Sequence, residues 1–251
     1  MLRANVMVST QDMTHRTVLV TSALPGEGKT STCATLAHSI AAAGPVVVAV
    51  DLDLRHPDLH DRFGMPNELG VSDILAERET LADCLRRVPL AGDPPRPLLH
   101  GKSDRGYAGR GELYVLTTGR PVGHPAELLG SALTGQMLEA LAETADLVLI
   151  DSPPVLPVAD TLIVGRLVAG ALLVVETGRS PLPAVEKAKS ALIRNQTRLL
   201  GVVLNRFDSR DTVYGYDGGE AAPARRSGLF RRRRRGLDGV DPPSDPSSSS
   251  R

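Results

Sequence analysis

Residues 22–30 read Ser-Ala-Leu-Pro-Gly-Glu-Gly-Lys-Thr, between an apolar run at 17–20 and an Ala-rich helical pattern at 31–43. A strand, a glycine-rich turn and a helix in this order predict a phosphate-binding loop, because backbone N–H groups and the positive helix N-terminus then face a phosphate. Lys29 is expected to reach the β and γ phosphates of a nucleotide, and the Thr30 hydroxyl to ligate its Mg²⁺. The strict pattern begins with glycine, whereas this loop begins with Ala23. The alternative is an ordinary glycine-rich turn.

Carboxylates follow two further buried strands. Residues 46–50 form an apolar run that ends in Asp51-Leu52-Asp53-Leu54-Arg55, and the run at 146–150 leads into Asp151. The carboxyl ends of parallel strands meet at one edge of a sheet, so these side chains are expected beside the phosphate-binding loop. Asp151 then suits a magnesium contact through water, and the Asp51/Asp53 pair suits metal contact or proton acceptance from an attacking hydroxyl.

These motifs give three sets of candidate residues. The predicted catalytic residues are Lys29, Asp51, Asp53 and Asp151. The predicted metal contacts are Thr30, Asp51 and Asp151. The predicted nucleotide contacts are Pro25, Gly26, Glu27, Gly28, Lys29, Thr30, Ser31, Arg55 and Asn205. The Asn205 amide suits an adenine edge, but an ordinary asparagine at a strand end explains it almost equally well.

The rest of the pattern alternates strands with helices, which predicts an α/β fold with a doubly wound, mostly parallel sheet of the P-loop nucleoside triphosphate hydrolase type. Further strands are expected at 113–116, 171–176 and 200–204. Further helices are expected at 71–76, 81–88, 125–143, 158–168 and 183–195. Residues 1–16 show no strong element. We therefore predict a domain over residues 1–208, in which the proline-rich residues 89–112 form a flexible insertion.

Composition is consistent with one such domain and a tail. The chain has 251 residues, 41% of them apolar, and a formal net charge of zero. Cys33 and Cys84 lie in helix-like segments without metal-ligand spacing, so we expect reduced core thiols in a cytosolic protein. The apolar runs are far shorter than the ~20 residues of a membrane-spanning helix, so any membrane association is expected to be indirect or peripheral.

Residues 209–251 lack hydrophobic periodicity and are rich in Gly, Pro, Ser and Arg, which predicts a disordered tail. The tail contains Tyr214 and Tyr216, half of the four tyrosines in the protein. Its run Arg231–Arg235 suits anionic lipid, at ~1 kcal/mol per residue, or an acidic partner. A solvated tail that aids solubility is an equal alternative, and no nucleic acid partner is expected.

The motifs resemble, in order and spacing, the bacterial tyrosine kinases that control capsular and exopolysaccharide synthesis. The similarity covers most of residues 1–207, and its most specific parts are Pro-Gly-Glu-Gly-Lys-Thr, Asp-x-Asp-x-Arg and Asp-Ser-Pro-Pro. These kinases share an ancestral fold with the MinD and ParA ATPases, which carry a second lysine directly after the first residue of the loop. That position is Leu24 here, which favours the kinase branch.

The resemblance implies an ATP- and Mg²⁺-dependent autokinase that regulates capsular or exopolysaccharide synthesis or export. Tyr214 and Tyr216 are the implied phosphoacceptors. The implied partner is a transmembrane chain-length regulator that activates the kinase and holds it, as a cytoplasmic protein, at the inner face of the membrane. The alternatives are a MinD-like regulatory ATPase and a nucleotide-binding scaffold for a membrane polysaccharide co-polymerase.

The family also places a Glu-x-x-Arg-x-x-Arg segment before its first strand, where it builds the interface of a homo-oligomeric ring. Leu2-Arg3-Ala4-Asn5 is similar to the end of that segment, with Arg3 as its last arginine. The preceding Glu and Arg would lie before Met1, so we expect a shortened or late-assigned start and an impaired ring.

Overall fold

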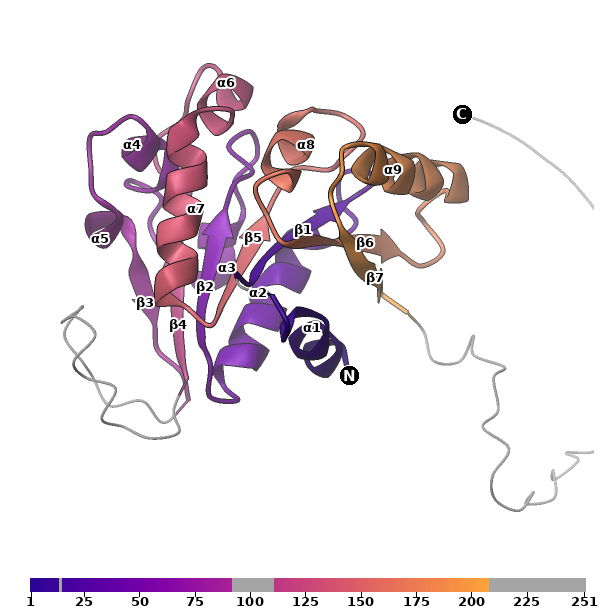
Figure 1. The fold of residues 1–251 in the computed structure, drawn as a ribbon, viewed down its shortest axis with the longest axis horizontal. Helices are drawn as coiled ribbons and strands as arrows, with labels where there is room; N and C mark the ends of the chain where they lie inside the picture. The colour runs from indigo at the N-terminus through magenta and orange to yellow at the C-terminus, as the bar shows by residue number, and fades with distance from the viewer. Residues whose placement is uncertain (14, 92–110, 208–251) are drawn as a thin grey trace, which may run out of the picture. The chain divides into compact units, whose positions relative to one another are not determined.

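A computed structural model of the chain describes residues 1–13, 15–91 and 111–207. The chain divides into two units, Met1–Ser209 and Arg210–Arg251, and only the first is described below. Its described part contains a seven-stranded sheet in the order β3-β4-β2-β5-β1-β6-β7 (Figure 1). The strands are β1 (Thr17–Ser22), β2 (Val46–Asp51), β3 (Arg86–Val88), β4 (Glu112–Leu116), β5 (Leu147–Asp151), β6 (Gly170–Glu176) and β7 (Leu199–Asn205). The helices are α1 (Leu2–Thr10), α2 (Lys29–Ala41), α3 (Leu59–Phe63), α4 (Val71–Leu75), α5 (Leu81–Cys84), α6 (Pro125–Leu129), α7 (Ala132–Thr144), α8 (Asp160–Gly165) and α9 (Leu182–Arg194).

The sheet is parallel except at one edge, where β3 pairs antiparallel with β4. β1 is flanked by β5 on one side and β6 on the other, and β5 separates it from β2. Connected strands such as β1 and β2 are not neighbours, so the segments that join them cross over the sheet. The helices of these crossovers cover both faces of the sheet. The predicted doubly wound α/β fold is confirmed.

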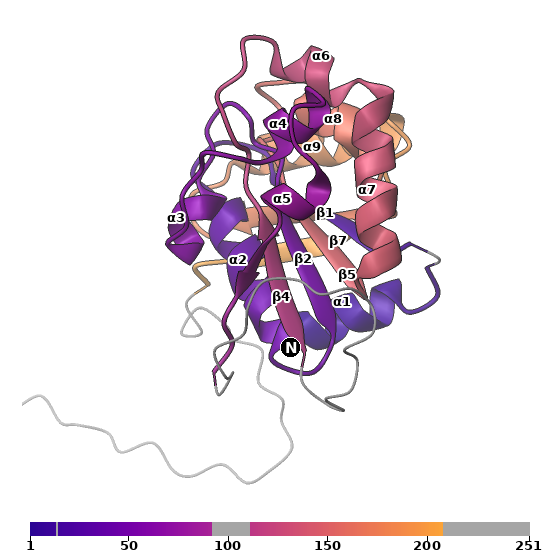
Figure 2. The same cartoon turned by 90° about the vertical axis from the view of Figure 1, so that its left-hand side faces the viewer.

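Two helical layers cover the sheet because its central strands are apolar on both sides. Val18 and Val20 face the core beneath α1, α2 and α3, whereas Leu19, between them, faces the core beneath α4 to α8. α9 packs over Leu173 on that second side. Figure 2 shows α2 and α3 on one side of the strands and α7 on the other. Strands buried on both faces explain the uninterrupted apolar runs.

Two predicted helices differ from the structure. The pattern at 81–88 predicts one helix, but α5 ends at Cys84 and residues 86–88 form β3. Pairing with β4 is a tertiary contact that overrides the local pattern there. The single helix predicted over 125–143 is interrupted by Gly130-Ser131, which separates α6 from α7.

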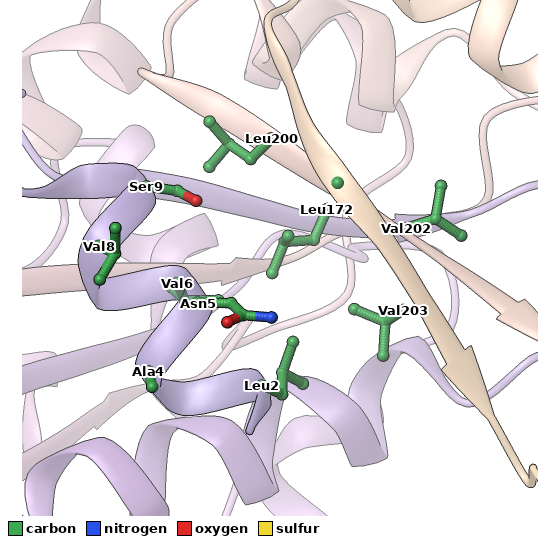
Figure 3. Close-up of a pocket in the computed structure, with 11 residues that line it drawn as sticks. Leu2, Ala4, Asn5, Val6, Val8, Ser9, Leu172, Leu200, Val202 and Val203 are labelled. Carbon is green, nitrogen blue, oxygen red and sulfur yellow. The ribbon is translucent and has the colours of Figure 1, made fainter. Parts of the chain in front are cut away.

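The prediction that residues 1–16 lack an element of their own is wrong. They include α1, in which Val6 is 1% exposed and packs in the core beneath the sheet. The Arg3 guanidinium donates to the Ser39 carbonyl of α2 at 3.3 Å. A groove of about 370 Å³ lies between α1 and β7, and none of its lining residues belongs to the phosphate-binding loop. Figure 3 shows the side chains that line it. Tertiary packing, which periodicity did not reveal, stabilises this helix.

Both cysteines are free and buried, as predicted. Burial raises the pKa of Cys33 well above its usual value, and raises the pKa of Cys84 to about 11. We therefore expect neither thiol to react rapidly with a thiol-specific disulfide reagent at pH 8 in the native protein, and both to react after unfolding in urea. The absorbance of the released reagent, followed over time, measures the rate of thiol reaction. Rapid reaction of either thiol in the native protein would contradict the prediction.

None of the helices in the described ranges is long and apolar enough to cross a membrane. The predicted insertion falls largely on residues 92–110, outside the described part of the chain. At its near end, Leu90 is 9% exposed and packs in the core beneath α2.

Candidate nucleotide-binding site

The phosphate-binding loop lies where β1 gives way to α2. Gly26 and Gly28 have φ values of +81° and +89°, a conformation that favours glycine. Gly28 is the N-cap residue of α2, so the helix begins at Lys29 with its free N–H groups facing the loop. The Asn205 amide, at the end of β7, donates to the Glu27 carbonyl at 3.0 Å. The predicted strand–loop–helix geometry is confirmed.

Gly28 also makes room for Asn205, because a Cβ on Gly28 would overlap the Asn205 amide nitrogen. Gly28→Ala is therefore expected to lower nucleotide affinity at least tenfold and to cost more than the ~1–2 kcal/mol of left-handed strain alone. Gly178→Ala is the matched control, because Gly178 has φ +76° with no atom within 4 Å of its Cβ position. Nucleotide titration and thermal melting of both variants measure the difference. Equal effects would show that the contact with Asn205 is unimportant.

Strand register brings the predicted carboxylates together. Asp51 of β2 pairs in register with Asp151 of β5, and Asp151 pairs with Val20 of β1. The Lys29 ammonium lies 2.9 Å from Asp53 Oδ2 and 3.8 Å from Asp151 Oδ1. Burial alone would lower the pKa of Lys29, but the attraction of Asp151, Asp53 and Asp51 outweighs it and raises the pKa. Lys29 is therefore charged.

Asp51 is fully buried and is held by backbone N–H groups. Its carboxylate accepts from Asp53 at 3.0 Å, Leu59 at 3.1 Å and Asp58 at 3.3 Å. Burial, with repulsion from Asp151, raises the pKa of Asp51 despite these donors. In this arrangement Asp51 fixes the loop that carries Asp53.

Asp151 is fully buried too, with the Lys29 ammonium 3.8 Å from Oδ1 and the Thr30 hydroxyl beside the carboxylate. Burial raises its pKa, while Lys29 and Thr30 lower it. Because Lys29 is shared with Asp53, a further cation at Asp151 would offset the cost of burying these carboxylates. Thr30, 5% exposed, lies at the same place and accepts from Lys29 at 3.2 Å. These residues fit a Mg²⁺ ion, which proteins hold by one or two oxygen ligands together with nucleotide phosphates.

The sequence did not reveal the contact between the phosphate-binding loop and the segment that follows β6. Glu27 is 3% exposed. One of its oxygens accepts from the Leu24 N–H at 2.8 Å and the other from the Ser180 hydroxyl. Ser180 in turn accepts from the Glu176 N–H at 2.8 Å. Glu27 therefore shapes the loop, and the only sequence signal for Ser180 was its place after a predicted strand.

Arg55 contacts a carboxylate on a different segment. Its guanidinium donates to both oxygens of the buried Asp160 at the start of α8, at 2.7 Å and 3.0 Å. This bidentate pair joins the loop after β2 to the segment after β5, so it fixes the two backbones that carry Asp51 and Asp151. A nucleotide contact of Arg55 stays a prediction.

The structure thus gathers Lys29, Thr30, Asp51, Asp53 and Asp151 at one edge of the sheet, with Asn205 on the loop. Tyr214, Tyr216 and Arg231–Arg235 lie outside the described residues. The fold and this site define a P-loop nucleotide-binding protein.

Comparison with known proteins gives the family. Residues 18–217 match the family described as the CobQ/CobB/MinD/ParA nucleotide binding domain. The chain is 32% identical over 218 residues to the tyrosine-protein kinase YwqD of Bacillus subtilis, covering 86% of this chain and 84% of YwqD. The crystal structure of the chimerical protein CapA2B2 is similar with a TM-score of 0.70 and 30% identity, covering 82% of each chain. The kinase domain of the Escherichia coli tyrosine kinase ETK gives a TM-score of 0.69 at 29% identity, covering 86% of this chain and 78% of that domain. The chain therefore belongs to the bacterial tyrosine kinases within this nucleotide-binding family, as its motifs suggested.

Proposed function

We propose that this protein is an ATP- and Mg²⁺-dependent protein-tyrosine autokinase. The observation that carries the proposal is the arrangement of Lys29 among three buried aspartates at the end of the phosphate-binding loop. A nucleotidase needs the lysine and a metal-binding carboxylate, and this site holds further carboxylates that can serve an attacking hydroxyl. Family membership supports the choice of tyrosine as the acceptor.

The roles follow from the contacts. The loop N–H groups and Lys29 would bind the phosphates, and Thr30 and Asp151 would hold a Mg²⁺ ion, whose charge would offset that of the transferring phosphoryl group. Asp53 Oδ2 is paired with Lys29, and its Oδ1 accepts from the His56 N–H at 3.0 Å. When Lys29 turns to the phosphates, Oδ2 becomes free to accept the proton of a tyrosine hydroxyl. Asp53 is thus the proposed proton acceptor.

The regulatory part of the proposal rests on the family resemblance. Tyr214 and Tyr216 are the proposed acceptors, and regulation of capsular or exopolysaccharide synthesis or export is the proposed role. A transmembrane chain-length regulator is the proposed activator, which would hold this protein at the inner face of the membrane. Anionic-lipid contact through Arg231–Arg235 is proposed from the positive charge of that run. Ring assembly is proposed only in an impaired form, because Arg3 is the only arginine of the interface segment that this sequence matches.

Mass spectrometry after incubation with ATP and Mg²⁺ tests the proposal, with and without the cytoplasmic segment of an activator. The expected result is phosphotyrosine at position 214 or 216, and no phosphotyrosine in the Tyr214→Phe/Tyr216→Phe variant. Free phosphate without phosphotyrosine would replace the kinase with a MinD-like regulatory ATPase. Nucleotide binding with neither product would leave a scaffold.

A further inference from the structure

The phosphate-binding loop supplies one side-chain cation, Lys29, from residues 22–30. A nucleotide di- or triphosphate carries several negative charges close together, so a further cation beside the loop would stabilise it. Such a cation can come from a segment that neighbours the loop in the fold.

Arg179, in the turn between β6 and α9, lies against this loop. Both of its terminal nitrogens are 3.7 Å from the position that a Cβ on Gly26 would occupy. Because Gly26 has no side chain, the guanidinium comes close to the loop backbone. The Arg179 side chain is 64% exposed, so its remaining N–H groups can reach a ligand.

Glu176, the last residue of β6, holds the arginine there. Its side chain is 8% exposed and lies 3.3 Å from Arg179 Nη1 and 2.6 Å from Arg206 Nη1. Arg179 therefore shares the Glu176 carboxylate with Arg206, so Glu176 does not occupy all of its N–H donors. The nearby Glu27 carboxylate is directed to the Leu24 N–H and the Ser180 hydroxyl.

We propose that Arg179 contacts the phosphate chain of the bound nucleotide as a second cation beside Lys29. The inference rests on the proposed nucleotide function of the site. A guanidinium presents a planar pair of N–H donors that matches two phosphate oxygens, and such charge-assisted hydrogen bonds are among the stronger ones in proteins. The contact would come from a loop outside the phosphate-binding motif.

Affinity for nucleotides with different numbers of phosphates tests this. ADP with Mg²⁺, and AMP, would be titrated by calorimetry or by displacement of a fluorescent ADP. Arg179→Gln is expected to weaken ADP binding about tenfold, equivalent to ~1.4 kcal/mol, and AMP binding by a clearly smaller factor, because AMP has a shorter phosphate chain. Arg179→Lys, which keeps the charge but loses the planar pair, should fall between.

Arg194→Gln is the matched control, because Arg194 is an exposed arginine in the last turn of α9. It removes the same charge away from the loop and should leave both affinities within twofold. Equal losses for ADP and AMP, or no loss, in Arg179→Gln would overturn the proposal. Failure of the wild-type protein to bind MgADP or MgATP would instead overturn the proposed nucleotide function.

Discussion

Lys29→Met is expected to lower the rate of phosphotyrosine formation by about two to three orders of magnitude, the usual cost of removing a preorganised electrostatic contact from a transition state. Lys29 is the cation that lies 2.9 Å from Asp53 and 3.8 Å from Asp151, at the N-terminus of α2. Without it, the loop N–H groups still bind phosphate, but the charge that shifts during transfer loses its side-chain partner. Initial rates of phosphotyrosine formation, by immunoblot or mass spectrometry, measure the loss.

The same variant should also lose stability, because Lys29 is the counter-ion of buried carboxylates. Asp51 and Asp151 are fully buried and Asp53 is 2% exposed. Removing one partner of a buried ion pair costs about 3–5 kcal/mol. The loss should be larger at pH 8 than at pH 5, because acid neutralises the carboxylates that Lys29 no longer balances. Urea unfolding at the two pH values measures it.

Lys187→Met makes the same chemical change on the exposed face of α9 and serves as the control. It should leave the rate unchanged and the free energy of unfolding within ~0.5 kcal/mol. A Lys29→Met protein that keeps the wild-type rate would show that Lys29 is not part of the phosphate site. One with wild-type stability would contradict its role as a counter-ion.

Asp151→Asn is expected to have opposite effects on stability and activity. The carboxylate is fully buried near Asp53 and Asp51, and among the described residues Lys29 alone faces the three, so a neutral side chain of the same shape removes a desolvation cost and a repulsion. The nucleotide-free variant should therefore be more stable than the wild type at pH 8. Its phosphotransfer rate should fall at least a hundredfold, because the metal loses a protein ligand.

The pH dependence of stability provides a second test of Asp151→Asn. The raised pKa values, about 8 for Asp51 and about 6 for Asp151, mean that the native protein holds protons that the unfolded chain releases near the ordinary value of 3.8. Their contribution to stability is present below about pH 4 and is lost as the pH rises towards 8. In urea-unfolding experiments between pH 4 and pH 8, the free energy of unfolding of Asp151→Asn should fall less steeply with pH than that of the wild type.

Asp12→Asn, at an exposed position after α1, controls for the loss of one carboxylate. It should change neither the rate nor the pH slope. Addition of ADP and Mg²⁺ should raise the melting temperature of the wild type by clearly more degrees than that of Asp151→Asn. Equal magnesium-dependent stabilisation of the two proteins would mean that Asp151 does not hold the metal.

Much of the site could be predicted because its residues lie in short sequence motifs. Lys29 and Thr30 follow a strand and a glycine-rich turn, and Asp51 and Asp151 each end an apolar run, so parallel pairing alone brings them together. Their partners could not be predicted in this way. Ser180 lies 153 residues from Glu27, and Asp160 lies 105 residues from Arg55. No local pattern encodes such pairs.

The fold shows the same division. Strands buried on both faces were readable from continuous apolar runs. The helix α1 and the strand β3 could not be predicted from the sequence, because each depends on a tertiary contact. The helix α1 packs on the core beneath α2, and β3 pairs with β4. Both lie at the margins of the sheet, where local sequence is a weaker guide than tertiary contact.

The pairing of Arg55 with Asp160 has a consequence for the kinetics of folding. The carboxylates of the site come from β2 and β5, and the salt bridge that fixes their loops closes a separation of 105 residues. Closing such a long loop has a large entropy cost, and this pair joins two surface loops rather than two core strands. We therefore expect the nucleotide pocket to be completed after the rate-limiting barrier of folding. A bound nucleotide should accordingly slow unfolding while leaving the refolding rate nearly unchanged.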